Sequence, residues 1–201
     1  MSDFDHQDVQ YMRACLHLAK VAAEQGEVPV GAVVVYHGPR QIGHHLTSPL
    51  GEVLASLGER AGQIIGVGYN LRETTHDPTG HAEVIAMRRA AARLGQWRLD
   101  ECTLYVTLEP CPMCAGAVVN ARIKRVVYGC DDHKAGAGRS LYELMDDHRL
   151  NHRAVVHSGL LKDQCAEVLK LFFAQRRQEK RQAKELAKEA ELLDRAPPTP
   201  D

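Results

Sequence analysis

The chain has 201 residues, of which 44% are hydrophobic, and its formal net charge at pH 7 is −1. This length and composition suffice for one domain with a sizeable core. The near-zero charge excludes a globally basic nucleic-acid binder, so any such binding must use a local patch. The chain opens with the acidic segment Met1–Asp5 and contains neither a signal-peptide core nor an apolar run long enough to cross a membrane. We therefore expect a cytoplasmic protein whose six cysteines are free or metal-bound thiols.

The hydrophobic pattern alternates between helical and strand-like periods. In chain order it predicts a helix over 6–25, strands over 28–35 and 63–69, a polar loop over 70–80, a helix over 82–94, a strand over 103–108, a helix over 111–121, a strand over 124–129, a glycine-rich loop over 131–139, a short helix that ends near 147, a weak strand over 154–156 and a last helix from about 162. Arg40–Gly43 and Gly62–Gly66 could each pair with the first strand, and we favour the second of these segments. We expect Glu27 to be an exposed carboxylate in a turn. Strands that alternate with helices predict an α/β sheet covered on both faces.

Residues 38–62 do not fit this alternation. Ser48 could cap a short helix that has Pro49 at its first position and Gly58 just past its end. One face of that helix would carry the apolar residues Leu50, Val53, Leu54 and Leu57. We expect this segment to be an extended hairpin tip that docks its leucine stripe on the protein surface.

Two short motifs supply the chemistry of a zinc site. His81-Ala82-Glu83 opens one predicted helix, and Pro110-Cys111-Pro112-Met113-Cys114 opens the next, where the two sulfurs lie one turn apart. Zinc favours nitrogen and sulfur ligands, and a catalytic zinc keeps its fourth position for water. We therefore interpret His81, Cys111 and Cys114 as metal ligands. Glu83 points away from His81 on the helix, which makes it a candidate catalytic acid and base.

A Cys-x-x-Cys pair also occurs in structural zinc knuckles and in redox pairs. A structural site would need a fourth ligand, for which Cys102 and Cys130 are candidates, but neither belongs to a ligand-like pair. We expect both of them, together with Cys15 and Cys165, to be buried small apolar residues.

The last helix changes character along its length. Its first part carries an apolar stripe that ends at Phe172-Phe173, and lysines and arginines interleaved with glutamates follow. From Lys184 onward we expect a solvated extension held by pairs of opposite charge. Arg176 and Arg177 directly follow the aromatic pair, which would fix them near the body. We therefore divide the chain into a domain over 1–175, with an insertion at about 38–62, and a basic helical extension with a proline-rich tail over 176–201.

The combination of His-x-Glu with Pro-Cys-x-x-Cys resembles the zinc-dependent nucleobase deaminases. In that chemistry zinc lowers the pKa of a bound water to roughly 7. The glutamate moves protons from the water to the ring nitrogen and to the departing ammonia.

Longer segments resemble the bacterial-type tRNA-specific adenosine deaminases, which convert adenosine at the anticodon wobble position to inosine. The segments that carry this resemblance are Glu27–Val33, His76–Glu83, Thr103–Cys111, Asn151–Arg153 and Phe172–Glu179. The match covers most of residues 8–181, and the segment 38–62 has no counterpart in the family. The zinc motif is shared by many deaminases, so the Phe-Phe-x-x-Arg-Arg run is the more discriminating piece.

The resemblance implies a cytidine-deaminase-like three-layer α/β/α sandwich with a mixed five-stranded central sheet. It implies a homodimer with one Zn2+ in each subunit and a tRNA anticodon stem-loop at each site, and it makes Glu83 the catalytic acid and base. The remaining site residues that it implies are Asn70 against the flipped nucleotide, Asp132 and Lys134 near the target ribose, and Arg176 and Arg177 on phosphates. Val28, Val30 and Leu108 could sandwich the purine ring.

Two other functions stay open from the sequence. The first is deamination of a free base or nucleoside of the guanine or cytosine type, against which stands the basic C-terminal helix. The second is a non-catalytic, zinc-stabilised tRNA-binding protein. Glu83 argues against that class, because a scaffold has no need of a carboxylate beside the metal.

Overall fold

The computed structural model describes residues 4–40, 42 and 64–194. The short helix expected between Ser48 and Gly58, and the docking of its leucine stripe, lie outside the described residues. No helix within the described part of the chain combines the length and the apolarity that crossing a membrane requires.

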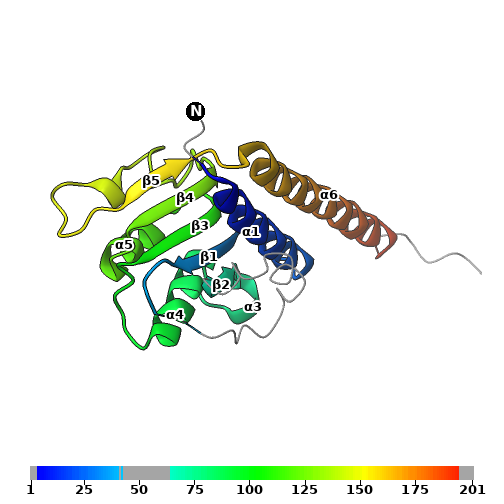
Figure 1. Ribbon diagram of the computed structural model, residues 1–201. Coiled ribbons are helices and arrows are strands. Elements are labelled where there is room, and N and C mark those ends of the chain that lie inside the picture. The colour runs from blue at the N-terminus through cyan, green and yellow to red at the C-terminus, as the bar shows by residue number, and fades with distance from the viewer. Residues whose placement is uncertain (1–3, 41, 43–63, 195–201) are drawn as a thin grey trace, which may run out of the picture.

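A five-stranded sheet with the order β2-β1-β3-β4-β5 forms the centre of the fold (Figure 1). Its strands are β1 (Gly31–Tyr36), β2 (Ile64–Tyr69), β3 (Cys102–Leu108), β4 (Arg125–Cys130) and β5 (Val155–Ser158). β1 pairs antiparallel with both β2 and β3, whereas β3 pairs parallel with β4 and β4 with β5. The mixed five-stranded sheet and the pairing of the first two strands are therefore confirmed.

Helices cover both faces of this sheet, which confirms the three-layer arrangement (Figure 1). The helices are α1 (His6–Glu24), α3 (Arg72–Thr75), α4 (Ala82–Leu94), α5 (Pro112–Ala121) and α6 (Lys162–Asp194), with a short 3-10 helix η2 (Leu144–Asp146). α1 and the beginning of α6 pack on the face that carries Val33 and Val127. α4 and α5 pack on the opposite face, which carries Val34 and Val126. Successive residues of a strand point to opposite faces, so each of the strands β1 to β4 contributes to both cores, whereas β5 contributes Val156 to one.

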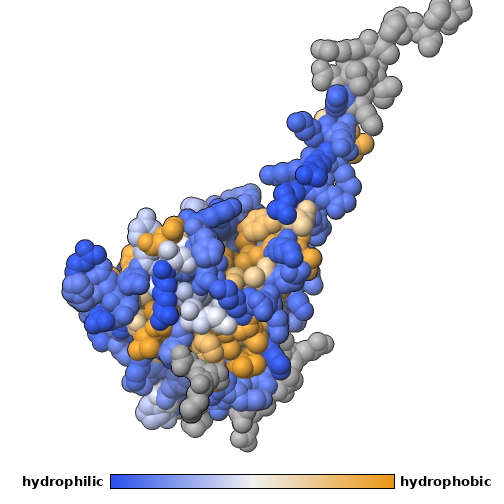
Figure 2. Space-filling view, turned by 90° about the horizontal axis from the view of Figure 1, so that it is seen from above, coloured by the Kyte–Doolittle hydropathy of each residue, from blue (hydrophilic) through white to orange (hydrophobic). Residues whose placement is uncertain are grey.

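The beginning of α6 packs on the body, and further along the helix the Arg176 side chain donates a hydrogen bond to the carbonyl of Gly26. Cys165, Val168 and Leu169 pack against the core, whereas residues 173–188 are all exposed. Figure 2 shows hydrophobic side chains gathered where α6 leaves the body and hydrophilic side chains along the part that projects. The solvent exposure expected from Lys184 onward is therefore confirmed as far as residue 188, whereas the pairs of opposite charge along it stay a prediction.

The segment before β1 differs from the prediction. β1 begins at Gly31 rather than at 28, because Pro29 has no N–H to donate and the N–H of Val30 donates to the carbonyl of Val28 (2.8 Å). Glu27 is 1% exposed, so the prediction of an exposed carboxylate was wrong. Its carboxylate accepts the backbone N–H of Thr74 at 2.7 Å.

The loop predicted over 70–80 contains the helical turn α3, which the sequence analysis missed. The first N–H groups of a helix have no partner within the helix. The Glu27 carboxylate supplies a partner for α3 from a segment more than forty residues earlier in the chain. The short helix predicted to end near 147 is the 3-10 helix η2, which ends at Asp146.

Candidate metal centre

The metal-binding residues predicted from the sequence lie at the starts of two helices. His81 is the N-cap of α4, Cys111 is the N-cap of α5, and Cys114 lies in the first turn of α5. The start of α4 approaches β2 so closely that a Cβ added to Gly68 would lie 2.1 Å from the carbonyl oxygen of Ala82. Glycine at this position therefore lets the strand and the helix bring His81 next to the end of β3, where Cys111 follows.

The three ligand atoms converge on one point. Nδ1 of His81 lies 3.7 Å from Sγ of Cys111 and 3.5 Å from Sγ of Cys114. All three atoms lie within 4.8 Å of one another, and among the described residues no fourth His, Cys, Asp or Glu joins the group. A set of one nitrogen and two sulfurs fits the preference of zinc and leaves one tetrahedral position for a non-protein ligand. These residues could therefore hold a metal ion of the catalytic type.

The other four cysteines are not part of this group. Cys15, Cys102, Cys130 and Cys165 are free and buried, as expected from the sequence. Burial raises the pKa of Cys102 to about 12 and that of Cys130 to about 11, so both remain thiols at neutral pH. Neither is a fourth ligand of the cluster, which disfavours a closed structural site.

The two cysteines of the cluster share one negative charge. Hydrogen bonds from Cys114 and His81 lower the pKa of Cys111 to about 4. The contact with Cys111 and burial raise the pKa of the Cys114 thiol. A thiolate beside a thiol and an imidazole is a site that a soft cation stabilises, because its charge favours the ligand form of both sulfurs.

Glu83 lies beside the cluster and is 3% exposed. Its Oε2 atom is buried and accepts no hydrogen bond from any described residue. Burial raises the pKa of Glu83 to about 7. A carboxyl group with a pKa near neutrality can both accept and release a proton at physiological pH, which is what a general acid and base must do.

A cavity of about 490 Å3 opens over the cluster. Its lining includes the predicted apolar residues Val28, Val30 and Leu108, the predicted polar residues Asn70, Asp132 and Lys134, and both His81 and Glu83. This volume lies within the range of roughly 300–1,000 Å3 that is typical of ligand pockets. The fold therefore brings every predicted base-pocket and ribose residue to the mouth of the metal cluster.

The structure separates the two predicted phosphate-binding arginines from this cavity. Arg176 lines a neighbouring hollow, where it donates to the carbonyl of Gly26 (2.8 Å), pairs with Glu179 (3.3 Å) and lies over the Phe172 ring (5.4 Å to its centroid). Arg177 is exposed and lines neither of these two hollows.

Glu109 is a site residue that the sequence analysis did not single out. It is 2% exposed and organises the loop that carries Asp132 and Lys134. The groups that donate to its carboxylate are the N–H groups of Asp132 (2.9 Å), Gly138 (3.0 Å), Arg139 (2.7 Å) and Ser140 (2.9 Å) and the hydroxyl of Ser140. Burial alone would raise the pKa of Glu109, but these hydrogen bonds outweigh burial and lower it. A carboxylate directly before Pro-Cys and ahead of a glycine-rich loop is the signal that could have identified it.

Known proteins are similar to this chain over nearly its whole length. A family model for MafB19-like deaminases matches residues 4–177. The tRNA-specific adenosine deaminase of Haemophilus influenzae is 43% identical over 187 residues, which cover 93% of both chains. The protein of the same name from Bacillus subtilis is 42% identical over 178 residues, which cover 89% of this chain and 96% of the relative.

A solved structure shares the fold. It comes from biochemical and structural studies of A-to-I editing by tRNA:A34 deaminases at the wobble position of transfer RNA. It is 36% identical to this chain, superposes with a TM-score of 0.65, and the match covers 79% of this chain and 98% of that chain.

Proposed function

This chain belongs to the tRNA-specific adenosine deaminase family, and we propose that it hydrolyses adenosine to inosine at the wobble position of tRNA anticodons. The single observation that carries this proposal is the cluster of His81, Cys111 and Cys114 with the buried Glu83 carboxylate beside it, whose Oε2 atom has no hydrogen-bond donor among the described residues. The metal is zinc, one per subunit, because one imidazole and two sulfurs are the donor set that zinc prefers.

The reaction exchanges the amino group of adenine for the oxygen of water. Zinc, when bound, makes a water molecule able to give up its proton near neutral pH. Glu83 accepts that proton and delivers it to N1 of the ring, while the water oxygen bonds to C6. Glu83 then carries the second proton of the water to the amino nitrogen, which leaves as ammonia. Its pKa of about 7 suits both the acceptance and the delivery of a proton.

The cavity residues hold the target nucleotide. The base must leave its stack to reach the metal, and an anticodon loop nucleotide is among the least costly to extrude. Val28, Val30 and Leu108 sandwich the purine ring, and Asn70 contacts its polar edge. Asp132 and Lys134 lie on the loop held by Glu109 and contact the RNA near the target ribose.

Editing of tRNA by the purified protein tests this function directly. Wobble inosine is sequenced in tRNA before and after addition of the protein, and zinc is quantified in the same sample. We expect adenosine at the wobble position to be replaced by inosine and one zinc per chain. Ammonia release from free guanine or cytosine, with none from an anticodon stem-loop, would instead establish the free-base alternative. Absence of ammonia from every substrate by the zinc-loaded protein would establish the non-catalytic alternative.

The protein acts as a homodimer, and we place the dimer contact on the face of α4 and α5. A shallow hollow of about 320 Å3 lies there, lined mainly by apolar residues that include Met87, Ala91 and Trp97. Trp97 is 61% exposed, and Met113 of α5 is 37% exposed. A large exposed apolar side chain beside an apolar hollow marks an interaction surface.

The mass of the protein in solution tests this contact. Trp97→Arg should shift the mass measured by light scattering from that of a dimer toward that of a monomer. Leu171→Arg is the matched control, because Leu171 is also 61% exposed but lies on α6. An unchanged dimer in the Trp97 variant would place the contact on another face.

A further inference from the structure

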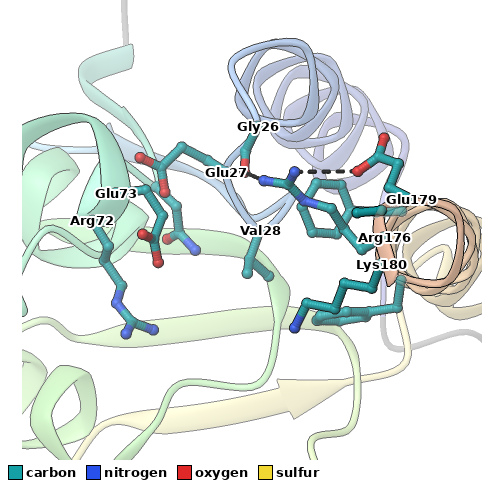
Figure 3. A pocket seen from close by; sticks show the side chains of 12 residues that line it. Gly26, Glu27, Val28, Arg72, Glu73, Arg176, Glu179 and Lys180 are labelled. Carbon is teal, nitrogen blue, oxygen red and sulfur yellow. Dashed lines mark hydrogen bonds and ion pairs between the residues drawn. The ribbon is translucent and has the colours of Figure 1, made fainter. Parts of the chain in front are cut away.

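Figure 3 shows a second hollow, of about 610 Å3, which shares lining residues with the cavity over the cluster of His81, Cys111 and Cys114. It lies between α3 and α6, with Arg72 and Glu73 on one wall and Arg176 and Lys180 on the other (Figure 3). The residues that line both hollows are Val28, Asn70, Arg72 and Phe173. The two hollows are therefore one continuous groove that leads from the metal to α6.

Two basic residues of this groove remain unpaired. Arg176 is directed at Gly26 and Glu179 rather than into the open space, as Figure 3 shows. Lys180 lies one turn further along α6, and Arg72 lies on the opposite wall. The side chain of neither Lys180 nor Arg72 makes a hydrogen bond or an ion pair with a described residue, although both line the hollow. Unpaired cations that face each other across a groove suit an anionic chain between them.

The acidic residues of the groove do not cancel this charge. Glu27 accepts an N–H of α3, and Glu179 is occupied by Arg176 and by Gln175. Glu73 is exposed, and its carboxylate makes no hydrogen bond or ion pair with a described residue. Two unpaired cations therefore face one unpaired acid.

The groove also offers an aromatic surface. Phe173 is 44% exposed and meets Phe172 edge to face, with ring centroids 5.5 Å apart. Exposed aromatic rings beside basic residues are the combination on which bases of single-stranded RNA stack while the cations contact its phosphates.

We propose that this groove binds the nucleotide adjacent to the target nucleotide, with Arg72 and Lys180 contacting phosphates from opposite walls and Phe173 contacting the base. Arg176 is a positioning residue, which anchors α6 so that Lys180 faces the groove. This assignment rests on the proposed function, because a free base has no phosphate and no neighbouring nucleotide to place there.

Binding of an anticodon stem-loop RNA at several salt concentrations tests the groove. Lys180→Ala should raise Kd severalfold at low salt and reduce the slope of log Kd against log salt by about 0.7, the loss of one contact to a single-stranded phosphate. Lys184→Ala is the matched control, because it removes the same charge from the same helix and Lys184 lines neither hollow. Glu73→Gln should act in the opposite direction and lower Kd.

A single neutral linkage in the RNA locates the contact. Methylphosphonate replaces each phosphate near the target in turn, and Kd is measured for wild type and for Lys180→Ala. Replacing one phosphate next to the target nucleotide should weaken binding to wild type but have no further effect on the Lys180 variant, because the two changes remove the same contact.

If wild type edits the RNA but Lys180→Ala and Lys184→Ala give the same Kd and salt slope, or if no linkage is coupled to Lys180, the groove assignment is overturned and the proposed function stands. If wild type edits no RNA, the proposed function itself fails, and the groove assignment fails with it.

Discussion

The backbone N–H of Ala82 donates a hydrogen bond to Oδ1 of Asn70 at 3.0 Å. The backbone N–H of Asn70 in turn donates to the carbonyl of Val30 (3.2 Å). Asn70 thus ties the end of β2 to the start of α4 and to the segment before β1, all at the rim of the metal cavity. Because its side-chain oxygen is occupied by the protein, the amide N–H groups are what Asn70 can offer to a substrate.

Two substitutions of Asn70 separate these roles. Asn70→Asp keeps an acceptor for Ala82, and a carboxylate is favourable at a helix start, so the free energy of unfolding should stay close to that of wild type. It removes the amide donors, so kcat/KM should fall by about tenfold or more, the value of one hydrogen bond to substrate. Asn70→Ala should lose the same activity and, in addition, about 1–3 kcal/mol of stability, because the Ala82 N–H is left unsatisfied. Denaturant unfolding and steady-state kinetics measure both, and an aspartate variant less stable than the alanine variant would contradict the assignment.

Glu83→Gln should abolish turnover while the metal stays bound. Glutamine keeps the size of the side chain but cannot exchange a proton, and the loss of a general acid and base costs about 10²–10⁴-fold in rate. Zinc content by mass spectrometry and inosine formation by sequencing are measured on the same preparation. Glu101→Gln, a change to an exposed acid outside the cavity, serves as the control. A near-normal rate for the Glu83 variant would remove this carboxylate from the mechanism.

Glu109→Gln should loosen the loop that carries Asp132 and Lys134. The new amide group would place a donor against N–H groups that already donate to this position, so we expect a loss of about 2–4 kcal/mol in stability. Ser140→Ala removes only one of the five donors and should cost about 1 kcal/mol.

The kinetic constants separate loop positioning from general destabilisation. At a temperature where both variants are folded, the Glu109 variant should show a raised KM for the anticodon stem-loop and an unchanged zinc content. Loss of zinc with an unaltered KM would show that Glu109 supports the metal ligands rather than the loop.

The stability of the protein should decrease in acid partly because of Asp8. Burial alone would raise the pKa of Asp8, but hydrogen bonds from Arg125 (2.7 Å) and from the Tyr105 hydroxyl (2.6 Å) outweigh it and hold the pKa below its ordinary value. A lowered folded-state pKa means that Asp8 stabilises the protein above its unfolded-state pKa of about 3.9 and that this contribution is lost as the pH falls through the folded-state value.

Asp8→Asn isolates this contribution. The variant should be less stable than wild type at pH 7. The difference should shrink as the pH is lowered below about 4, where the Asp8 carboxylate of the unfolded wild-type chain takes up a proton, and should continue to shrink until the folded-state carboxylate is protonated as well. Urea unfolding of both proteins between pH 7 and pH 3 measures it. A difference that is constant over this range would show that the charge of Asp8 is not what stabilises the fold.

The sequence by itself determined those features that depend only on residues close together in the chain. His81, Cys111 and Cys114 could be assigned because a helix start and a spacing of three residues place ligands without reference to the rest of the chain. The order of strands and helices followed from their hydrophobic periods, and with it the layers of the fold.

Only the tertiary structure decided which groups donate hydrogen bonds to the buried carboxylates of Glu27 and Glu109. Glu27 meets Thr74, and Glu109 meets Ser140, across separations of 47 and 31 residues. Apart from the Ser140 hydroxyl, the donors to these two carboxylates are backbone N–H groups, which every residue except proline carries, so residue types alone do not identify these partners.

The orientation of α6 was likewise decided by packing. Helical periodicity shows that Arg176 and Lys180 share a face, but it does not show how that face is rotated against the body. The contact of Arg176 with Gly26 sets this rotation, which leaves Arg176 anchored and Lys180 open to the groove. The sequence marks both residues only as cations, and their different surroundings arise from contacts between segments 150 residues apart.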